Sequence, residues 1–80
     1  MRILIVEDEV TLSQTLQDGL KEFGYQSDIA ENLSDARYMI DIRNYDLVLL
    51  DWMLPDGNGI DIIGEIKNKS HKTSVIVLSA

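Results

Sequence analysis

The stretch LVLLD at residues 47–51 decides the fold class, because four consecutive apolar residues run directly into an acid. Two further runs, ILIV at residues 3–6 and VIVL at residues 75–78, have the same unbroken apolar character. Strands that are apolar on both faces are typical of a parallel sheet that helices cover on both sides. The three runs therefore predict a parallel α/β architecture.

Stretches with helical periodicity separate these runs, and two of them have a recognisable boundary. The first ends at Gly24, where a left-handed C-cap residue belongs. The second begins after Asn32, a good N-cap residue, and has Asp35 in its first turn. The residues expected to face the core recur at helical spacing in three predicted helices: Leu12, Leu16, Leu20 and Phe23; Leu33, Ala36 and Ile40; and Ile60, Ile63 and Ile66.

The remaining segments complete a βαβαβαβ order. Residues 25–30 form a weaker strand, which we expect at an edge of the sheet, and LPDGNG at residues 54–59 is a dense turn signal. Within that turn, Gly59 is expected to permit entry into the third helix. The sequence stops just after the fourth predicted strand, so we expect it to be the front part of a longer domain.

Composition excludes several classes of function. The 80 residues carry a formal net charge of -7, which repels nucleic acid and anionic membranes, so the chain itself is expected to bind neither. The absence of cysteine excludes disulfides and thiolate metal sites. The first apolar run is too short for a signal peptide or a membrane span, and a cytoplasmic location is expected.

Acids stand where two of the predicted strands end. Glu7 and Asp8 follow the first run, Asp51 follows the run at residues 47–50, and the hydroxyl of Ser79 follows the last run. Ligands of open α/β sheets bind at the carboxyl ends of the strands. Two carboxylates 4 Å apart repel by roughly 4 kcal/mol at an effective dielectric near 20. Three of them held together therefore require a cation or partial protonation, and carboxylates with few other ligands suit Mg²⁺.

Each acid taken alone is also typical of a solvated loop residue. Asp8 is well placed to cap the first helix, a role that is compatible with metal binding. Asp51 fits the solvated reading less well, because it lies between four apolar residues and the sequence WMLP at residues 52–55.

Four motifs together resemble the receiver domain of two-component response regulators. They are ILIVEDE at residues 3–9, YDLVLLD at 45–51, MLPDG at 53–57 and LSA at 78–80, and they occur in the order and spacing of that family. The resemblance implies a CheY-like (flavodoxin-like) doubly wound parallel sheet over residues 1–80. Its strand order would be 2-1-3-4, without the fourth helix, fifth strand and fifth helix of the family.

The resemblance also implies roles for the acids. Asp51 corresponds to the phosphoacceptor, which takes a phosphoryl group from a sensor histidine kinase in a reaction that needs Mg²⁺ or Mn²⁺. Asp8 and Asp51 correspond to direct metal ligands, and Glu7 to a ligand that acts through a bound water. Met53 corresponds to the residue whose backbone carbonyl completes the metal site.

Further roles fall at and beyond the end of the sequence. Ser79 corresponds to the switch hydroxyl, and the backbone N–H of Ala80 to a donor for the same phosphoryl oxygens. The lysine that pairs with the phosphoryl group in this family would come after Ala80. The motifs are most similar to the OmpR/PhoB subgroup, which implies a homodimer, a C-terminal winged-helix domain that binds DNA, and regulation of transcription.

Two other classes of function stay open on the sequence. A phosphatase of the haloacid dehalogenase kind also has a nucleophilic Asp at a strand end, but it needs a second Asp where this chain has Met53. The same residue opposes a toprim-type nuclease site. An interaction module would keep the fold without phosphorylation, and the intact set of acids argues against it.

Overall fold

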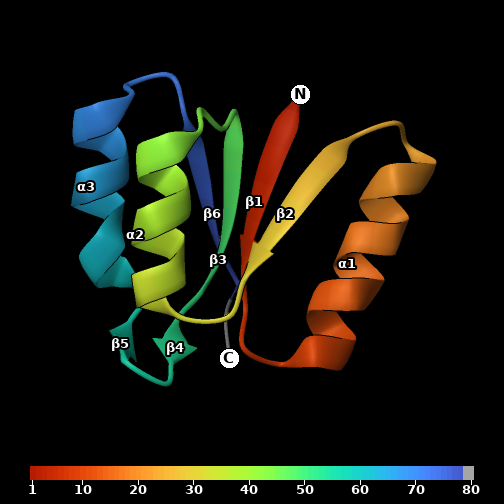
Figure 1. Ribbon diagram of the computed structural model, residues 1–80, viewed down its shortest axis with the longest axis horizontal. Coiled ribbons are helices and arrows are strands. Elements are labelled where there is room, and N and C mark those ends of the chain that lie inside the picture. The colour runs from red at the N-terminus through yellow and green to blue at the C-terminus, as the bar shows by residue number, and fades with distance from the viewer. Residues whose placement is uncertain (79–80) are drawn as a thin grey trace.

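The computed structural model describes residues 1–78, which form a four-stranded parallel sheet between two layers of helices (Figure 1). The elements are β1 (Arg2–Val6), α1 (Val10–Glu22), β2 (Gln26–Ala30), α2 (Leu33–Ile42), β3 (Leu47–Asp51), β4 (Met53–Leu54), β5 (Gly57–Asn58), α3 (Ile60–Lys69) and β6 (Ser74–Leu78). The strand order is β2-β1-β3-β6. Since β6 is the fourth strand of this sheet, the predicted order 2-1-3-4 is confirmed.

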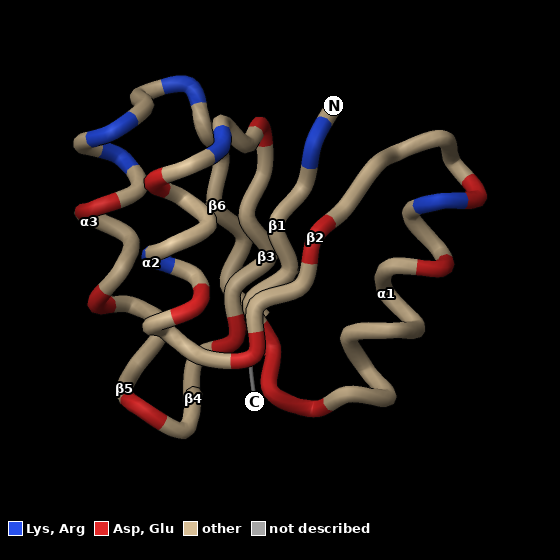
Figure 2. The backbone as a smooth tube through the Cα atoms, in the orientation of Figure 1, with Lys and Arg blue, Asp and Glu red and all other residues tan. Residues whose placement is uncertain are grey.

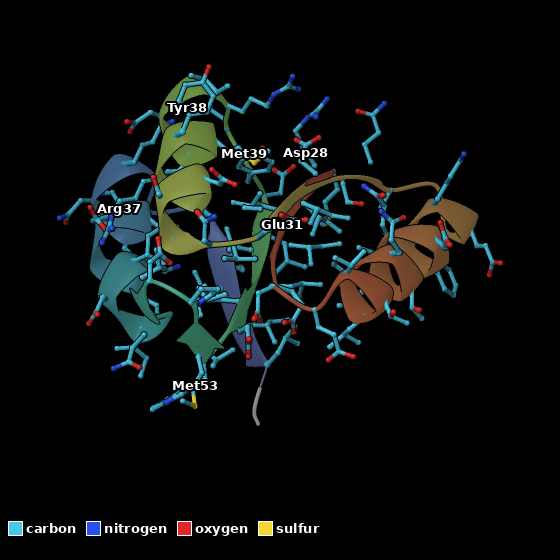
Figure 3. All side chains as sticks on the ribbon, turned by 60° about the horizontal axis from the view of Figure 1, so that its bottom comes forward. Asp28, Glu31, Arg37, Tyr38, Met39 and Met53 are labelled. Atoms are coloured by element: carbon cyan, nitrogen blue, oxygen red, sulfur yellow. The ribbon has the colours of Figure 1, made fainter. Side chains whose placement is uncertain are left out.

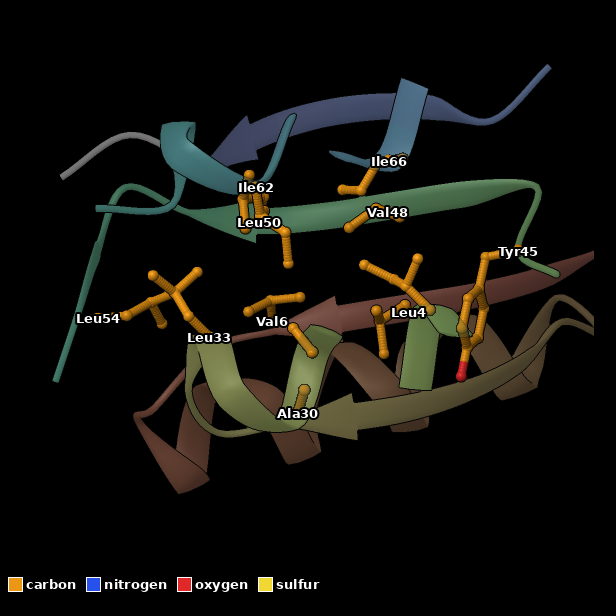
Figure 4. Close-up of a cluster of buried hydrophobic side chains, with 12 residues drawn as sticks. Leu4, Val6, Ala30, Leu33, Tyr45, Val48, Leu50, Leu54, Ile62 and Ile66 are labelled. Carbon is orange, nitrogen blue, oxygen red and sulfur yellow. The ribbon is translucent and has the colours of Figure 1, made fainter. Parts of the chain in front are cut away.

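The unbroken apolar runs are explained by the two layers. Helix α1 lies on one side of the sheet, and α2 and α3 lie on the other (Figure 1). Ile3 and Ile5 pack toward α1, where Leu16 and Leu20 meet them. The alternate residues of the strands belong to a larger cluster beneath α2 and α3, part of which Figure 4 shows. Its buried members are Leu4, Val6, Ala30, Leu33, Ala36, Ile40, Tyr45, Val48, Leu50, Leu54, Ile62 and Ile66.

The predicted helix boundaries hold where a local cap determines them. Gly24 has φ +83, so the left-handed residue is present at the end of α1. Asn32 caps α2, because its side-chain oxygen accepts a hydrogen bond of 2.8 Å from the backbone N–H of Asp35. None of the described helices is both long enough and apolar enough to cross a membrane.

The core-facing residues predicted for α1 are only partly correct. Phe23 is 79% exposed and Leu12 is 38% exposed, so only Leu16 and Leu20 of that series pack on the sheet. Phe23 is the C-cap residue, beyond the last regular turn of α1.

In α3 the predicted series also differs from the buried face. Ile66 is buried as predicted and Ile63 packs against the same cluster, but Ile60 is 44% exposed, and the buried Ile62 was not predicted. A spacing of three residues falls short of the 3.6-residue turn, so the series 60, 63, 66 drifts around the helix. Ile62 and Ile66 are four apart and therefore share the face toward the sheet.

Strand β6 leaves apolar surface exposed. It pairs with β3 on one side, and within residues 1–78 no strand pairs with its other edge. Ile76 is 51% exposed and Val77 is 36% exposed. Because successive residues of a strand point to opposite faces, apolar surface is exposed on both faces of β6. Strand β6 therefore has an uncovered apolar edge within the described residues.

A polar cluster of Arg2, Asp28 and Tyr45 connects β1, β2 and the segment that leads into β3, at the end of the sheet where β1 begins. The Tyr45 hydroxyl donates a hydrogen bond of 2.8 Å to Asp28 Oδ2, and Arg2 contacts the same oxygen at 3.1 Å. Burial, followed by the interaction with Asp28, raises the pKa of Tyr45 to about 12. The protonated phenol is therefore favoured by folding.

We expect Tyr45→Phe to lower the free energy of unfolding by about 1–2 kcal/mol, because Asp28 loses a charge-assisted hydrogen bond. The pKa of the phenol rises from 10.0 to about 12 on folding, so its contribution is full below pH 10 and is lost as the pH rises through 12. Urea unfolding of wild type and Tyr45→Phe across this pH range measures the difference in their free energies of unfolding. Tyr38→Phe is the matched control, since Tyr38 is 66% exposed. A difference between wild type and Tyr45→Phe that does not shrink above pH 10 would contradict this account.

Candidate metal centre

The predicted acids lie together because β1 and β3 are parallel neighbours. Val6 pairs with Leu50 in the sheet, so the residues that follow them, Glu7 and Asp51, leave the same edge side by side. Figure 2 shows the acidic segments at the ends of β1 and β3 gathered at one end of the sheet. Both acids are held by strand backbone: Glu7 N–H donates to Ala30 O at 2.9 Å, and Asp51 pairs with Leu78 of β6.

The three carboxylates form one cluster. Oxygen atoms of Glu7, Asp8 and Asp51 all lie within 4.8 Å of one another. Glu7 is buried at 5% exposure, Asp51 is half-buried and Asp8 is exposed. The exposure of the three carboxylates therefore increases from Glu7 through Asp51 to Asp8, so a ligand can approach from the Asp8 side.

The electrostatics of the cluster favour a cation. Burial is the largest cause that raises the pKa of Glu7, and the neighbouring Asp8 and Asp51 raise it further. The backbone N–H of Glu9, which donates to Glu7 Oε2 at 3.1 Å, opposes this shift. A divalent cation would offset the repulsion without protonation. Three hard oxygen donors at mutual distances of this size fit Mg²⁺, which takes carboxylates and completes its shell with water.

The predicted cap at Asp8 is wrong. Helix α1 begins at Val10, and its N-cap residue is Glu9, whose side chain makes no capping hydrogen bond. The turn between β1 and α1 is longer by one residue than a cap at Asp8 requires. The Asp8 carboxylate instead lies in the cluster with Glu7 and Asp51.

The segment after Asp51 folds into a small hairpin that the turn signal did not predict. Strands β4 and β5 pair antiparallel, Met53 with Asn58 and Leu54 with Gly57. The Met53 side chain is 64% exposed and points away from the sheet (Figure 3). The role implied for Met53 belongs to its backbone carbonyl, so an exposed side chain does not oppose that role.

Gly59 is needed for its small size rather than for its flexibility. Its backbone is ordinary helix, with φ -56 and ψ -34, and it is the N-cap residue of α3, so the expected role at helix entry is present but depends on the missing side chain. A Cβ at this position would lie 2.0 Å from Asp51 O and 3.0 Å from Leu50 Cγ. The Gly59 N–H also donates to Trp52 O at 2.7 Å. The start of α3 is thus pressed against the backbone of the candidate site.

We expect Gly59→Ala to lower the free energy of unfolding by about 1–3 kcal/mol, because the new methyl group forces the backbone of Asp51 and α3 apart. Gly64→Ala in the same helix is the matched control, since a Cβ there meets nothing within 4 Å. That control is expected to stabilise the protein by about 0.5–1 kcal/mol through helix propensity. Denaturant unfolding of both variants compares them, and equal effects of the two substitutions would contradict the close approach.

One residue near the site was missed by reasoning from the sequence. The Asp56 carboxylate accepts hydrogen bonds from the backbone N–H groups of Leu33 and Ser34, at 2.8 and 3.0 Å. An acid in a Pro-Asp-Gly turn indicates only the turn itself. Its partners lie 23 and 22 residues away along the chain, so no local pattern reveals the contact. Ser79 and Ala80 lie outside the described residues, and their predicted roles stay predictions.

Comparison with known proteins agrees with this geometry. Residues 3–80 match the model of the response regulator receiver domain. The chain is 43% identical over 79 residues to the transcriptional regulatory protein PcoR of Escherichia coli, covering 99% of this chain and 35% of PcoR. It is 41% identical over 80 residues to the probable transcriptional regulatory protein SilR of Salmonella typhimurium, covering 100% of this chain and again 35% of the relative. The chain thus spans about a third of the length of these relatives.

Solved structures show the same fold. The non-phosphorylated receiver domain of HemR from Leptospira biflexa matches with a TM-score of 0.91 and 38% identity, over 99% of this chain and 64% of that one. TrrA from Thermotoga maritima, solved in complex with Mg²⁺ and BeF, matches with a TM-score of 0.91 and 40% identity, over 99% of this chain and 69% of that one. The chain therefore belongs to the response regulator receiver domain family.

Proposed function

We propose that this chain is a phosphoacceptor module in which Asp51 takes a phosphoryl group from a sensor histidine kinase in a reaction that requires Mg²⁺ or Mn²⁺. The observation that carries the proposal is the cluster of Glu7, Asp8 and Asp51 oxygens within 4.8 Å, at the carboxyl ends of parallel strands. Membership of the receiver domain family supports the same reading.

Each residue of the cluster has a distinct part in the proposal. Asp8 and Asp51 would bind the cation directly, the Met53 carbonyl would complete the site, and Glu7 would act through a water. When bound, the cation supplies positive charge that offsets the repulsion between carboxylate and phosphoryl oxygens. The relative TrrA was solved with Mg²⁺ and BeF, which supports this assignment for the family fold.

The transfer itself requires little covalent chemistry from the protein. A carboxylate oxygen of Asp51 forms a bond to phosphorus as the P–N bond of the phosphohistidine breaks, and the imidazole leaves with the electron pair. Such a transfer depends mainly on in-line positioning and charge stabilisation. The strand backbone holds Asp51 in place for the attack. Ser79 and the N–H of Ala80 are proposed to bind the phosphoryl oxygens afterwards.

The wider role follows from the relatives. PcoR and SilR are named as transcriptional regulators, and this chain covers 35% of each. We propose that the protein containing this chain works in the cytoplasm, forms a homodimer and binds DNA through a separate domain. The chain itself has a net charge of -7, which repels nucleic acid, so we propose that another part of the protein contacts DNA.

Intact-mass measurement with a small phosphodonor such as acetyl phosphate tests the proposal. With Mg²⁺ the protein is expected to gain the mass of one phosphoryl group, and with a chelator it is expected to gain none. Hydroxylamine should remove the added group, because an aspartyl phosphate is an acyl phosphate. Steady release of phosphate without a modified protein would instead indicate a phosphatase, and no reaction at all would favour an interaction module.

A further inference from the structure

The N-terminus of α2 is capped from outside its own segment. Asn32 binds the backbone N–H of Asp35 at 2.8 Å, which is an ordinary local cap. The Asp56 carboxylate binds the two preceding N–H groups, those of Leu33 and Ser34, at 2.8 and 3.0 Å. The hydrogen bond from Leu33 is the largest cause that lowers the pKa of Asp56, so the carboxylate is ionised at neutral pH.

Asp56 lies at the tip of the β4–β5 hairpin, which begins two residues after Asp51. Apolar packing holds the hairpin against the same helix end. Leu54 and Leu33 are buried in one cluster, where their side chains lie together (Figure 4). A Cβ on Gly57 would come within 2.9 Å of Leu33 Cδ1, so the hairpin backbone rests directly on that side chain.

The base of the hairpin is fixed to the candidate site. The Gly59 N–H donates to Trp52 O at 2.7 Å, and the Gly59 backbone presses on the carbonyl of Asp51. The backbone from Asp51 to Met53 is therefore held at both ends. The strand and Gly59 hold one end, and the hairpin with its Asp56 contact to α2 holds the other.

We propose that Asp56 is a positioning residue for the cation site, which holds the backbone carbonyl of Met53 in place by anchoring the β4–β5 hairpin to the N-terminus of α2. This inference rests on the proposed function, because it assumes that the Met53 carbonyl binds the cation. Asp56 does not touch the cation itself. Its contribution is to keep the loop after Asp51 in the geometry that Mg²⁺ needs, since Mg²⁺ tolerates little deviation from octahedral coordination.

The experiment compares Mg²⁺ affinity in variants that weaken the same helix end in different ways. Asp56→Ala removes two caps of α2 together with the hydrogen bonds that anchor the hairpin, whereas Asn32→Ala removes the neighbouring cap and leaves those hydrogen bonds in place. Calorimetric titration with MgCl₂ is expected to show a loss of about tenfold for Asp56→Ala, the scale of outer-shell effects on metal sites. Asn32→Ala is expected to keep the wild-type affinity, although its melting temperature falls as well.

Two further measurements separate positioning from general loss of stability. Asp56→Asn keeps one acceptor oxygen and is expected to have an intermediate affinity, which matters if Asp56→Ala does not fold. In metal-free protein, the Gly59 N–H is expected to exchange with solvent faster in Asp56→Ala than in Asn32→Ala, because only the former frees the hairpin.

The outcomes distinguish this inference from the proposed function. If Asp8→Ala binds Mg²⁺ far more weakly than wild type, but Asp56→Ala binds it as tightly as Asn32→Ala, positioning by Asp56 is overturned while the cation site stands. If wild type itself does not bind Mg²⁺, both are overturned. An affinity loss confined to the Asp56 variants supports the inference.

Discussion

Replacing Asp8 by Ala is expected to weaken Mg²⁺ binding by about 100-fold, at the upper end of what even outer-shell substitutions cost at metal sites. Asp8 is the exposed member of the acid cluster, so it is the carboxylate that an arriving cation meets first. Without it, Glu7 and Asp51 remain, and the cation loses both a ligand and one of three negative charges that attract it.

The single Trp residue of the chain makes this measurable. Trp52 directly follows Asp51 and is 44% exposed, so its fluorescence reports on the site during a Mg²⁺ titration. Glu9→Ala is the matched control, because it removes an acid from the same turn that lies outside the cluster and makes no capping hydrogen bond. An unchanged affinity in Asp8→Ala, or an equal loss in Glu9→Ala, would remove Asp8 from the direct ligands.

Sequence alone predicted the parts of the fold that depend on local chemistry. The unbroken runs predicted buried parallel strands, and the structure places them at residues 2–6, 47–51 and 74–78. Gly24 and Asn32 act within a few residues of their own positions, so their caps were readable. The acid cluster was predictable for a related reason: parallel neighbours end at the same edge of the sheet, which brings Glu7 and Asp51 together.

The features that sequence reasoning missed depend on contacts between distant segments. The Asp56 cap joins residues 23 positions apart, and the size limit at Gly59 comes from the carbonyl of Asp51. Neither contact leaves a periodic signal in the chain. The exposure of Phe23 and Ile60 has local causes instead: Phe23 is the C-cap residue beyond the last turn of α1, and a spacing of three residues carries Ile60 off the face that Ile62 and Ile66 share.

Replacing Asp51 by Asn is expected to abolish phosphoryl uptake completely. The amide has nearly the same shape as the carboxylate, so the fold is retained, but it has no anionic oxygen to attack phosphorus. The substitution also removes one of three clustered negative charges, so we expect no loss of stability. Asp61→Asn is the matched control, since Asp61 is an exposed acid in the first turn of α3, outside the cluster.

The intact mass of wild type, Asp51→Asn and Asp61→Asn after incubation with acetyl phosphate and Mg²⁺ tests the central claim most directly. We predict one added phosphoryl group on wild type and on Asp61→Asn, and none on Asp51→Asn. Equal modification of wild type and Asp51→Asn would show that the phosphoryl group is accepted elsewhere, and would contradict the assignment of Asp51 as the phosphoacceptor.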